Sequence, residues 1–374
     1  MTETRRTLHQ IPEPGFGEVE TAGLVAAHLR ALGLEVQEGV GITGVVGRLG
    51  QGRPCIALRA DMDALPIQEE TGQPYASRRA GYMHACGHDA HVTSLLGAAM
   101  LLAQQPPTQG EVRFLFQPSE EGPDAAGKSG AARMIDDGAM EGVDAVVGLH
   151  VDTNLLQGQL GFRVGPVMAA ADRFTITIHG QGCHAAHPEK GVDAIVLAAQ
   201  VIMALQTVIS RRLPPTKGRV ITVGTIEGGV RYNVVADTVK MGGTIRSYSP
   251  EVRAQLINEM EQACRIVEPL GGAFDLVIQE GFPVTVNEPA ITGLVRQVAV
   301  ELIGEAALAE IQPEMGAEDF SLLADKAPGC YLRLGVTTPG QPPRTIHSPT
   351  FDLDERALPL GAAILAGAAL RFLA

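Results

Sequence analysis

Histidines, one cysteine and several carboxylates of this 374-residue chain occur in short motifs that lie at the end of a predicted strand or at the start of a predicted helix. The motifs are RADMDALP (Arg59–Pro66), MHACGHDAH (Met83–His91), QPSEEG (Gln117–Gly122), VVGLH (Val146–His150) and RTIHSP (Arg344–Pro349). Thiolate, imidazole and carboxylate groups are the usual ligands of zinc and related divalent ions. Because ligands of open α/β sheets bind at the carboxyl ends of the strands, this pattern predicts a metal site at that edge.

The spacing inside the motifs supports the same chemistry. Cys86 and His88 are two residues apart and can point to the same side of an extended loop. Glu120 and Glu121 are adjacent and cannot easily share one role, so one could bind metal while the other moves protons. A single histidine after a strand is more often a surface residue, and an adjacent glutamate pair is more often a solvated helix start. The recurrence of such features at four strand ends favours the metal site.

The first half of the chain alternates helix-like and strand-like segments. Helices are predicted at 21–32, with Gly33 as the stop signal, at 91–105 and at 129–137. Strands are predicted at 44–49, 55–60, 112–117 and 145–150. Short apolar strands that alternate with helices indicate an α/β fold with a mostly parallel sheet.

The middle of the chain has a different order of elements. Strands are predicted at 173–180, 219–229, 237–247 and 274–280, with helices at 193–212 and 250–268, the second capped by Ser249. The order βαββαβ is that of a ferredoxin-like domain. We therefore expect a discontinuous α/β domain, residues 1–168 and 285–374, that carries residues 169–284 as an insertion.

Composition narrows the classes of function. The formal net charge of −13 argues against nucleic acid or an anionic membrane as partner, because either requires a basic face. The beginning MTETRRTLHQ lacks the apolar run of a secretory signal, and five scattered cysteines without a CxxC pair favour a reducing compartment, so we expect a cytoplasmic protein. Neither a GxSxG nor a GxGxxG motif is present, which argues against a serine hydrolase and a nicotinamide enzyme.

The motifs also carry a resemblance to a known family. RADMDALP, MHACGHDAH, QPSEEG, GLHV, HGQGCHAAHP, GTIEGG, MGAEDF and IHSP resemble, in this order, the amidohydrolase branch of the aminoacylase and carboxypeptidase metallopeptidase superfamily. That branch includes hippurate hydrolases, N-acyl-amino-acid amidohydrolases and auxin-conjugate hydrolases, and the match covers nearly the whole chain. The resemblance implies a two-domain metallohydrolase whose insertion serves as a lid and dimerisation domain.

The resemblance also implies roles for individual residues. The implied metal ligands, which jointly hold two divalent ions (zinc, manganese, cobalt or nickel), are Cys86, His88, Glu121, His150 and His347. Glu120 matches the general base, and Asp63 matches an acid that orients a ligating histidine. In the insertion, His184 matches a residue that reaches into a neighbouring subunit's site, and Asn233 and Arg246 match positions that contact the substrate's carboxylate end. Glu318 matches a motif near the substrate, to which the sequence assigns no individual role.

The implied activity is hydrolysis of the amide bond in small N-acyl amino acids, such as N-acetyl or N-benzoyl compounds, by a metal-bridging hydroxide with Glu120 as base. The implied assembly is a homodimer or homotetramer formed through the lid domain. A dipeptidase or carboxypeptidase of the same superfamily is the nearest alternative, although no group for a free α-amine is identified. A non-catalytic metal-binding homologue would have lost Glu120 or a ligand, and all are present. Departures from the family pattern at Cys183, Glu189 and Ala236 bear on substrate preference.

Overall fold

The computed structural model describes residues 1–374 and divides into two compact units. The first unit comprises Met1–Val167, Val286–Gln312 and Asp319–Ala374, and the second comprises Met168–Thr285 and Pro313–Glu318. The placement of Pro313–Glu318 corrects our expectation, which assigned this segment to the α/β domain. The segment joins the second unit because the backbone N–H of Ala169 donates to the carbonyls of Glu314 and Gly316.

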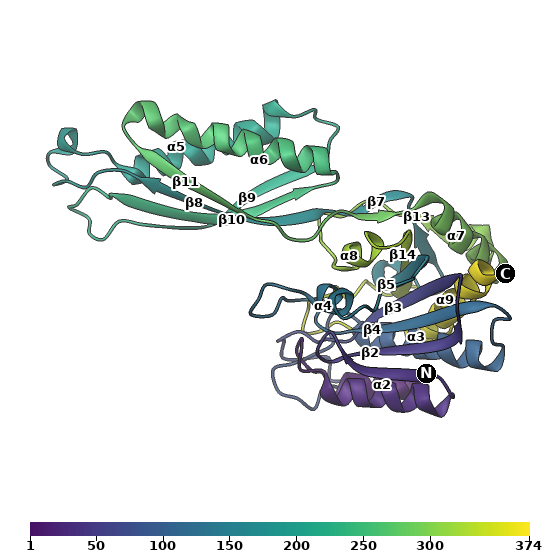
Figure 1. The fold of residues 1–374 in the computed structure, drawn as a ribbon. Helices are drawn as coiled ribbons and strands as arrows, with labels where there is room; N and C mark the ends of the chain where they lie inside the picture. Colours follow the sequence, from purple (N-terminus) through teal and green to yellow (C-terminus); the bar gives the residue numbers. More distant parts are fainter. The chain divides into compact units, whose positions relative to one another are not determined.

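The first unit is built on an eight-stranded sheet with the order β1-β2-β4-β3-β5-β14-β6-β13 (Figure 1). Its central strands β4, β3, β5 and β14 run parallel, which confirms the predicted α/β fold with a mostly parallel sheet. The strands are β1 (Glu35–Val40), β2 (Gly44–Gln51), β3 (Cys55–Asp61), β4 (Gly110–Gln117), β5 (Ala145–Leu156), β6 (Leu160–Phe162), β13 (Leu308–Glu310) and β14 (Gly329–Thr337). The short strands β7 (Gly165–Met168) and β12 (Thr285–Asn287) pair separately.

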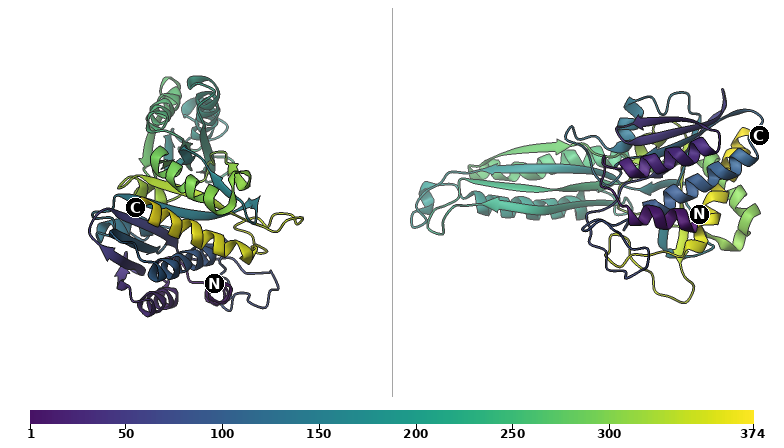
Figure 2. Two further views of the ribbon diagram at one scale, coloured as in Figure 1. Left: turned by 90° about the vertical axis from the view of Figure 1, so that its right-hand side faces the viewer. Right: turned by 90° about the horizontal axis from the view of Figure 1, so that it is seen from below.

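Helices cover this sheet and complete its core. Helix α3 packs along α9, and α9 also contacts α7 (Figure 2). Every residue of β3 and of β4 is buried, as is typical of parallel strands covered on both faces. The helices are α1 (Thr2–Gln10), α2 (Val19–Ala31), α3 (His88–Gln104), α4 (Gly130–Asp136), α7 (Pro289–Ile303), α8 (Phe320–Ala324) and α9 (Leu358–Leu373), with 3-10 turns at Glu305–Ala307 and Glu355–Ala357.

The second unit is a four-stranded antiparallel sheet with two helices. Its strands follow the order β11-β8-β10-β9, and the chain order βαββαβ is the predicted ferredoxin-like one. Asp193 caps the first helix and Ser249 caps the second, whose first residue is Pro250 as predicted. The elements are β8 (Ala170–His179), α5 (Ala194–Thr207), a π-helical turn (Val208–Arg212), β9 (Arg219–Gly228), β10 (Thr238–Ser247), α6 (Pro250–Cys264) and β11 (Ala273–Gln279), with 3-10 turns at Pro188–Lys190 and Arg265–Leu270.

Two boundaries differ from the prediction in ways that concern function. Helix α3 begins at His88 and not at His91, so a proposed metal ligand occupies its first turn. Strand β5 continues past His150 to Leu156, because residues beyond His150 still pair with β14. His150 therefore lies within a strand, where the strand backbone holds its position more firmly than a loop would.

Two helical stretches, Ala194–Arg212 and Glu355–Leu373, are long and apolar enough to cross a membrane by length and composition alone. They are 33% and 56% buried within the structure, and the second packs against α3 as a core helix. Core helices commonly share this length and composition, so the two stretches are weak evidence for a membrane.

Candidate metal centre

The ends of three parallel strands bring the first candidates together. Strand β3 ends at Asp61, and Asp63 follows it; β4 ends at Gln117 and leads to Glu120 and Glu121. His150 lies on β5, which pairs with the other side of β3. Because β4, β3 and β5 are parallel neighbours, these residues share the carboxyl edge of the sheet. This edge is where the sequence predicted a metal site.

The sulfur of Cys86 lies at the centre of the ligand group. It is 3.4 Å from Nε2 of His150 and 3.3 Å from Nε2 of His347. The same His347 nitrogen lies 3.1 Å from Oε1 of Glu121. These contacts unite side chains from three loops and one strand. The structure thus places the donor atoms of Cys86, His150, His347 and Glu121 in one cluster.

His88 joins this cluster through the Nε2 atom of its ring, which also lies 3.7 Å from Oδ2 of Asp61. Its Nδ1 lies 2.8 Å from the backbone oxygen of Asp63, which orients the ring. Its Nε2 is buried and has no hydrogen-bond partner, as expected of a nitrogen whose lone pair is reserved for a cation. Five groups of donor atoms lie within 4.8 Å of one another, and three of them consist only of the predicted ligands and Glu120: Cys86, His88 and His150; Cys86, Glu121 and His347; and His88, Glu120 and Glu121.

The donor types test whether a divalent ion fits. A mixed set of thiolate, imidazole and carboxylate groups suits zinc, manganese, cobalt or nickel. Burial raises the pKa of the Cys86 thiol to about 12, although the neighbouring His88 acts in the opposite direction. A thiol in such a place is deprotonated only when a cation stabilises the thiolate. The residues therefore fit a divalent metal, and metal binding must release a proton.

Asp63 organises the loop that carries the two glutamates. Its Oδ1 accepts the backbone N–H of Glu120 at 3.1 Å, and its Oδ2 accepts that of Glu121 at 3.0 Å. Burial opposes ionisation, but the contact with His88 and the two amide donors hold the pKa of this carboxyl below its usual range. Asp63 therefore remains a carboxylate, oriented toward His88 on one side and the glutamate loop on the other.

Further restraints hold the same loop. Ser119 adopts a positive φ of 39°, a costly conformation for a residue with a side chain. Its backbone N–H donates to Oε1 of Glu18 at 2.8 Å, and its hydroxyl donates to the carbonyl of Gly122 at 2.6 Å. His347 likewise adopts a φ of 58°. Strained backbone at both segments is consistent with a site whose geometry the surrounding structure imposes.

Two residues of the site, Asp61 and His91, received no role from the sequence. Nδ1 of His91 lies 2.6 Å from Oδ1 of Asp61, and its Nε2 accepts the backbone N–H of Val151 at 3.0 Å. Both ring nitrogens are thus engaged, so His91 supports β5 beside His150 and has no lone pair left for a metal. The available signals were the paired acids of RADMDALP and the last histidine of MHACGHDAH, but neither distinguishes a supporting residue from a ligand.

The remaining candidates, His184, Asn233, Arg246 and Glu318, all belong to the second unit. The exposed loops of His184 and Asn233 lie side by side, because the N–H of Ala185 donates to the carbonyl of Asn233 at 3.1 Å. Arg246 lies half-buried on β10, and burial lowers the pKa of its guanidinium. Glu318 closes the segment Pro313–Glu318. The roles of these four residues stay predictions.

Comparisons with known proteins agree with this geometry. Residues 57–371 match the model of Peptidase family M20/M25/M40. N-acetyl-L-cysteine deacetylase of Bacillus subtilis is 42% identical over 95% of this chain and 83% of its own length. Thermostable carboxypeptidase 2 of Saccharolobus solfataricus is 39% identical over 99% of this chain and 94% of its own length.

A solved structure extends the likeness to the fold. The Bacillus subtilis YXEP protein, a dinuclear metal binding peptidase from the M20 family, superimposes with a TM-score of 0.87 at 34% identity. The superposition covers 99% of this chain and 96% of that one. With a family match over most of its length and relatives of this identity, the chain belongs to Peptidase family M20/M25/M40.

Proposed function

We propose that this chain hydrolyses the amide bond of small N-acyl amino acids, releasing a carboxylic acid and an amino acid. The enzyme is a metal-dependent amidohydrolase of its family. The observation that carries the proposal is the adjacent pair Glu120 and Glu121. Glu121 joins the donor group of Cys86 and His347, whereas Glu120 belongs to no group that contains either of those two residues. The name of the deacetylase relative supports an N-acyl amino acid as substrate.

Five residues would hold two divalent ions: Cys86, His88, Glu121, His150 and His347. Two such ions would polarise the substrate carbonyl and lower the pKa of an attacking water. Glu120 accepts the proton of that water on its carboxylate and later donates it to the leaving amine, so one group serves as base and then as acid. Asp63 keeps Glu120 in place by accepting a hydrogen bond from the backbone N–H of Glu120.

The second unit would supply substrate contacts and assembly. In this proposal His184 of a partner subunit stabilises the oxyanion, and Asn233 and Arg246 bind the carboxylate end of the substrate, near Glu318. The chain would act as a homodimer or homotetramer through this unit. Support comes from helix α5, where Val196 and Met203 are 52% and 67% exposed despite being large and apolar. All five cysteines are unpaired, which supports a reducing, cytoplasmic setting.

The test is an assay of the purified chain on a panel of N-acetyl and N-benzoyl amino acids, with and without chelator. We expect amide hydrolysis that chelator abolishes and zinc, manganese, cobalt or nickel restores. Elemental analysis of the same sample should give about two ions per chain. A wild-type chain that binds no metal and hydrolyses none of these compounds after metal addition would overturn the proposal.

Two matched variants separate the roles of the glutamates. Glu120→Gln should retain metal and lose about 10²- to 10⁴-fold in kcat, because only proton transfer is removed. Glu121→Gln should bind metal much more weakly, because the negative charge is lost and one of the two carboxylate oxygens becomes an NH₂ group that cannot act as a ligand. Near-normal turnover in Glu120→Gln would show that another group is the base.

A carboxypeptidase is the second candidate, favoured by the relative of that name. Such an enzyme acts on free peptides. Comparing hydrolysis rates for N-acetyl amino acids and for unblocked dipeptides with the same C-terminal residue decides between the two. A clear preference for the unblocked dipeptides would replace the amidohydrolase proposal by this one.

A further inference from the structure

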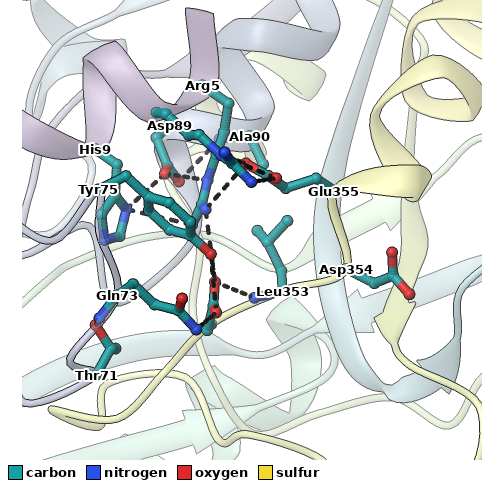
Figure 3. A network of polar contacts seen from close by, with 12 residues as sticks. Arg5, His9, Thr71, Gln73, Tyr75, Asp89, Ala90, Leu353, Asp354 and Glu355 are labelled. Carbon is teal, nitrogen blue, oxygen red and sulfur yellow. Dashed lines mark hydrogen bonds and ion pairs between the residues drawn. The ribbon is translucent and has the colours of Figure 1, made fainter. Parts of the chain in front are cut away.

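The first helix buries an arginine against the metal-ligand segments. Arg5 on α1 has no exposed surface, and His9 one turn later is 1% exposed. Arginine is almost never fully buried unless it is paired, so its partners indicate what it does. These partners, shown in Figure 3, are not among the residues that bind metal or move protons in the proposed function.

Arg5 contacts two separate parts of the chain. Its Nε lies 2.7 Å from Oδ2 of Asp89, as an ion pair. Its Nη1 lies 3.5 Å from Oδ1 of Asp352 and 3.5 Å from Oε1 of Glu355. The planar guanidinium thus bridges Asp89 and Glu355 (Figure 3), and it also pairs with Asp352 on the same side as Glu355.

Both parts adjoin proposed metal ligands. Asp89 directly follows His88 at the start of α3, and Asp352 lies five positions after His347. Oδ1 of Asp89 also accepts the backbone N–H of Ala90 at 2.9 Å, so the carboxylate is fixed to the first turn of the helix. The guanidinium therefore links the segment of His88 to the segment of His347, in addition to the backbone hydrogen bond that the N–H of His347 donates to the carbonyl of Ala85 at 2.8 Å.

A third segment strengthens the link. The hydroxyl of Tyr75 donates to Oδ2 of Asp352 at 3.1 Å, and Nε2 of Gln73 donates to the same oxygen at 3.0 Å. Nδ1 of His9 lies 2.7 Å from the Asp89 oxygen that Arg5 also contacts. Removing Arg5 would leave the fully buried carboxylate of Asp89 without its arginine partner, which is strongly unfavourable. Asp352 would keep Arg344 at 3.0 Å and Glu355 would keep Arg6 at 2.7 Å, but neither of these arginines pairs with Asp89.

We propose that Arg5 is a positioning residue for the metal centre: it holds the His88 and His347 segments at the separation that metal binding requires. The inference deepens the proposed function and rests on its ligand assignment. Supporting groups outside the ligand set of a metal centre commonly change metal affinity by about 10- to 100-fold when they are removed. Arg5, like Asp63, contacts two ligand segments, but it acts on the segments of His88 and His347.

The adjacent Arg6 provides a matched control. Arg6 also pairs with Glu355, at 2.7 Å, and also lies over the Tyr75 ring, at 4.6 Å compared with 5.0 Å for Arg5. Its side chain is 47% exposed, and its ion pair with Glu355 contains no contact to Asp89. The substitutions Arg5→Met and Arg6→Met therefore remove the same charge from the same helix, and only the first removes the bridge.

The experiment measures the affinity of the full-length chain for Co²⁺ by competition with a chelator, and the visible absorption of the cobalt-loaded chain. We expect Arg5→Met to weaken cobalt binding about tenfold or more and to alter the thiolate-to-cobalt absorption. Arg6→Met should bind within about twofold of wild type. Arg5→Lys should restore part of the affinity, because an ammonium can pair with Asp89 but cannot span to Asp352.

The outcomes are distinguishable. Equal cobalt affinity in Arg5→Met and Arg6→Met, with wild type binding normally, would overturn the positioning role and leave the proposed function standing. A wild-type chain that binds no cobalt would overturn both. If Arg5→Met does not fold in chelator, Asp352→Asn decides, because it weakens the link on the His347 side and leaves Arg5 paired with Asp89. Reduced cobalt affinity in that variant supports the inference, and unchanged affinity overturns it.

Discussion

Replacing Asp63 by asparagine tests how much the hydrogen bonds from Asp63 to the glutamate loop contribute to activity, because the substitution leaves the residues of that loop unchanged. Asp63 is buried, and its two oxygens each accept one backbone N–H, from Glu120 and from Glu121. An asparagine offers one oxygen and one NH₂ group at nearly the same positions. One of the two backbone donors would therefore face another donor inside the protein.

The magnitude follows from that mismatch. A buried donor left without an acceptor costs about 1–3 kcal/mol. If this cost displaces Glu120 from its position, kcat falls about 5- to 150-fold, at about 1.36 kcal/mol for each factor of ten. Loss of the negative charge beside His88, whose Nδ1 lies 3.2 Å from Oδ1, should also weaken metal binding by about 10- to 100-fold.

Asp144→Asn provides the matched control for this variant. The Asp144 carboxylate also accepts a backbone N–H, from Cys55 at 2.9 Å, but it precedes β5 at the amino edge of the same sheet. The assay compares kcat at saturating metal and substrate, and metal affinity by chelator competition, for the two variants. If Asp63→Asn matched Asp144→Asn within about twofold in both quantities, the reasoning about the glutamate loop would be refuted.

Two further predictions concern charge and ligation. Cys86→Ala should lose metal, because the central sulfur of the cluster is removed; retention of both ions by elemental analysis would take Cys86 out of the ligand set. Burial opposes the charge on His9, but Asp89 and Glu69 outweigh it and raise its pKa to about 9. Since this exceeds the unfolded value of 6.5, the stabilisation by His9 is complete below about pH 6.5 and is lost as pH rises through about 9. This pKa shift corresponds to about 3 kcal/mol of stabilisation. We therefore expect the difference in unfolding free energy between wild type and His9→Gln, measured in the presence of chelator, to decrease between about pH 6 and pH 10. A difference independent of pH would contradict the charged state of His9.

The sequence was sufficient for the architecture because its signals are local. Fully apolar short strands at 55–60 and 112–117 indicated buried parallel neighbours, and the structure has them as β3 and β4. Because Asp63, Glu120 and Glu121 follow the ends of these two strands, the sequence alone predicted that the three side chains lie near one another. The caps Asp193 and Ser249 likewise marked helices that are present.

Other features depended on contacts that no local pattern records. Arg5 and His9 lie in a polar N-terminal helix, where charged residues are normally solvated. They are buried because they pair with carboxylates that are 80 or more positions away in the sequence, Asp89 and Asp352. The positive φ of Ser119 and of His347 is equally invisible in sequence, because neither residue is glycine. The segment Pro313–Glu318 belongs to the second unit through backbone hydrogen bonds with Ala169. Backbone groups are the same in nearly every residue, so no sequence pattern predicts these bonds.

The late position of His347 has a consequence for how the enzyme acquires its metal. Cys86 and His347 are 261 positions apart, and β14, which precedes His347, is an interior strand between β5 and β6. During synthesis the N-terminal segments therefore emerge with a gap in their sheet and with Cys86 and His88 lacking a partner ligand. The centre is completed only when the last part of the chain has left the ribosome, inserted β14 and packed α9 on α3. A nascent chain that ends before His347 thus lacks one of the five proposed ligands however well the rest has folded, so we expect the full ligand set to form only after His347 has been synthesised.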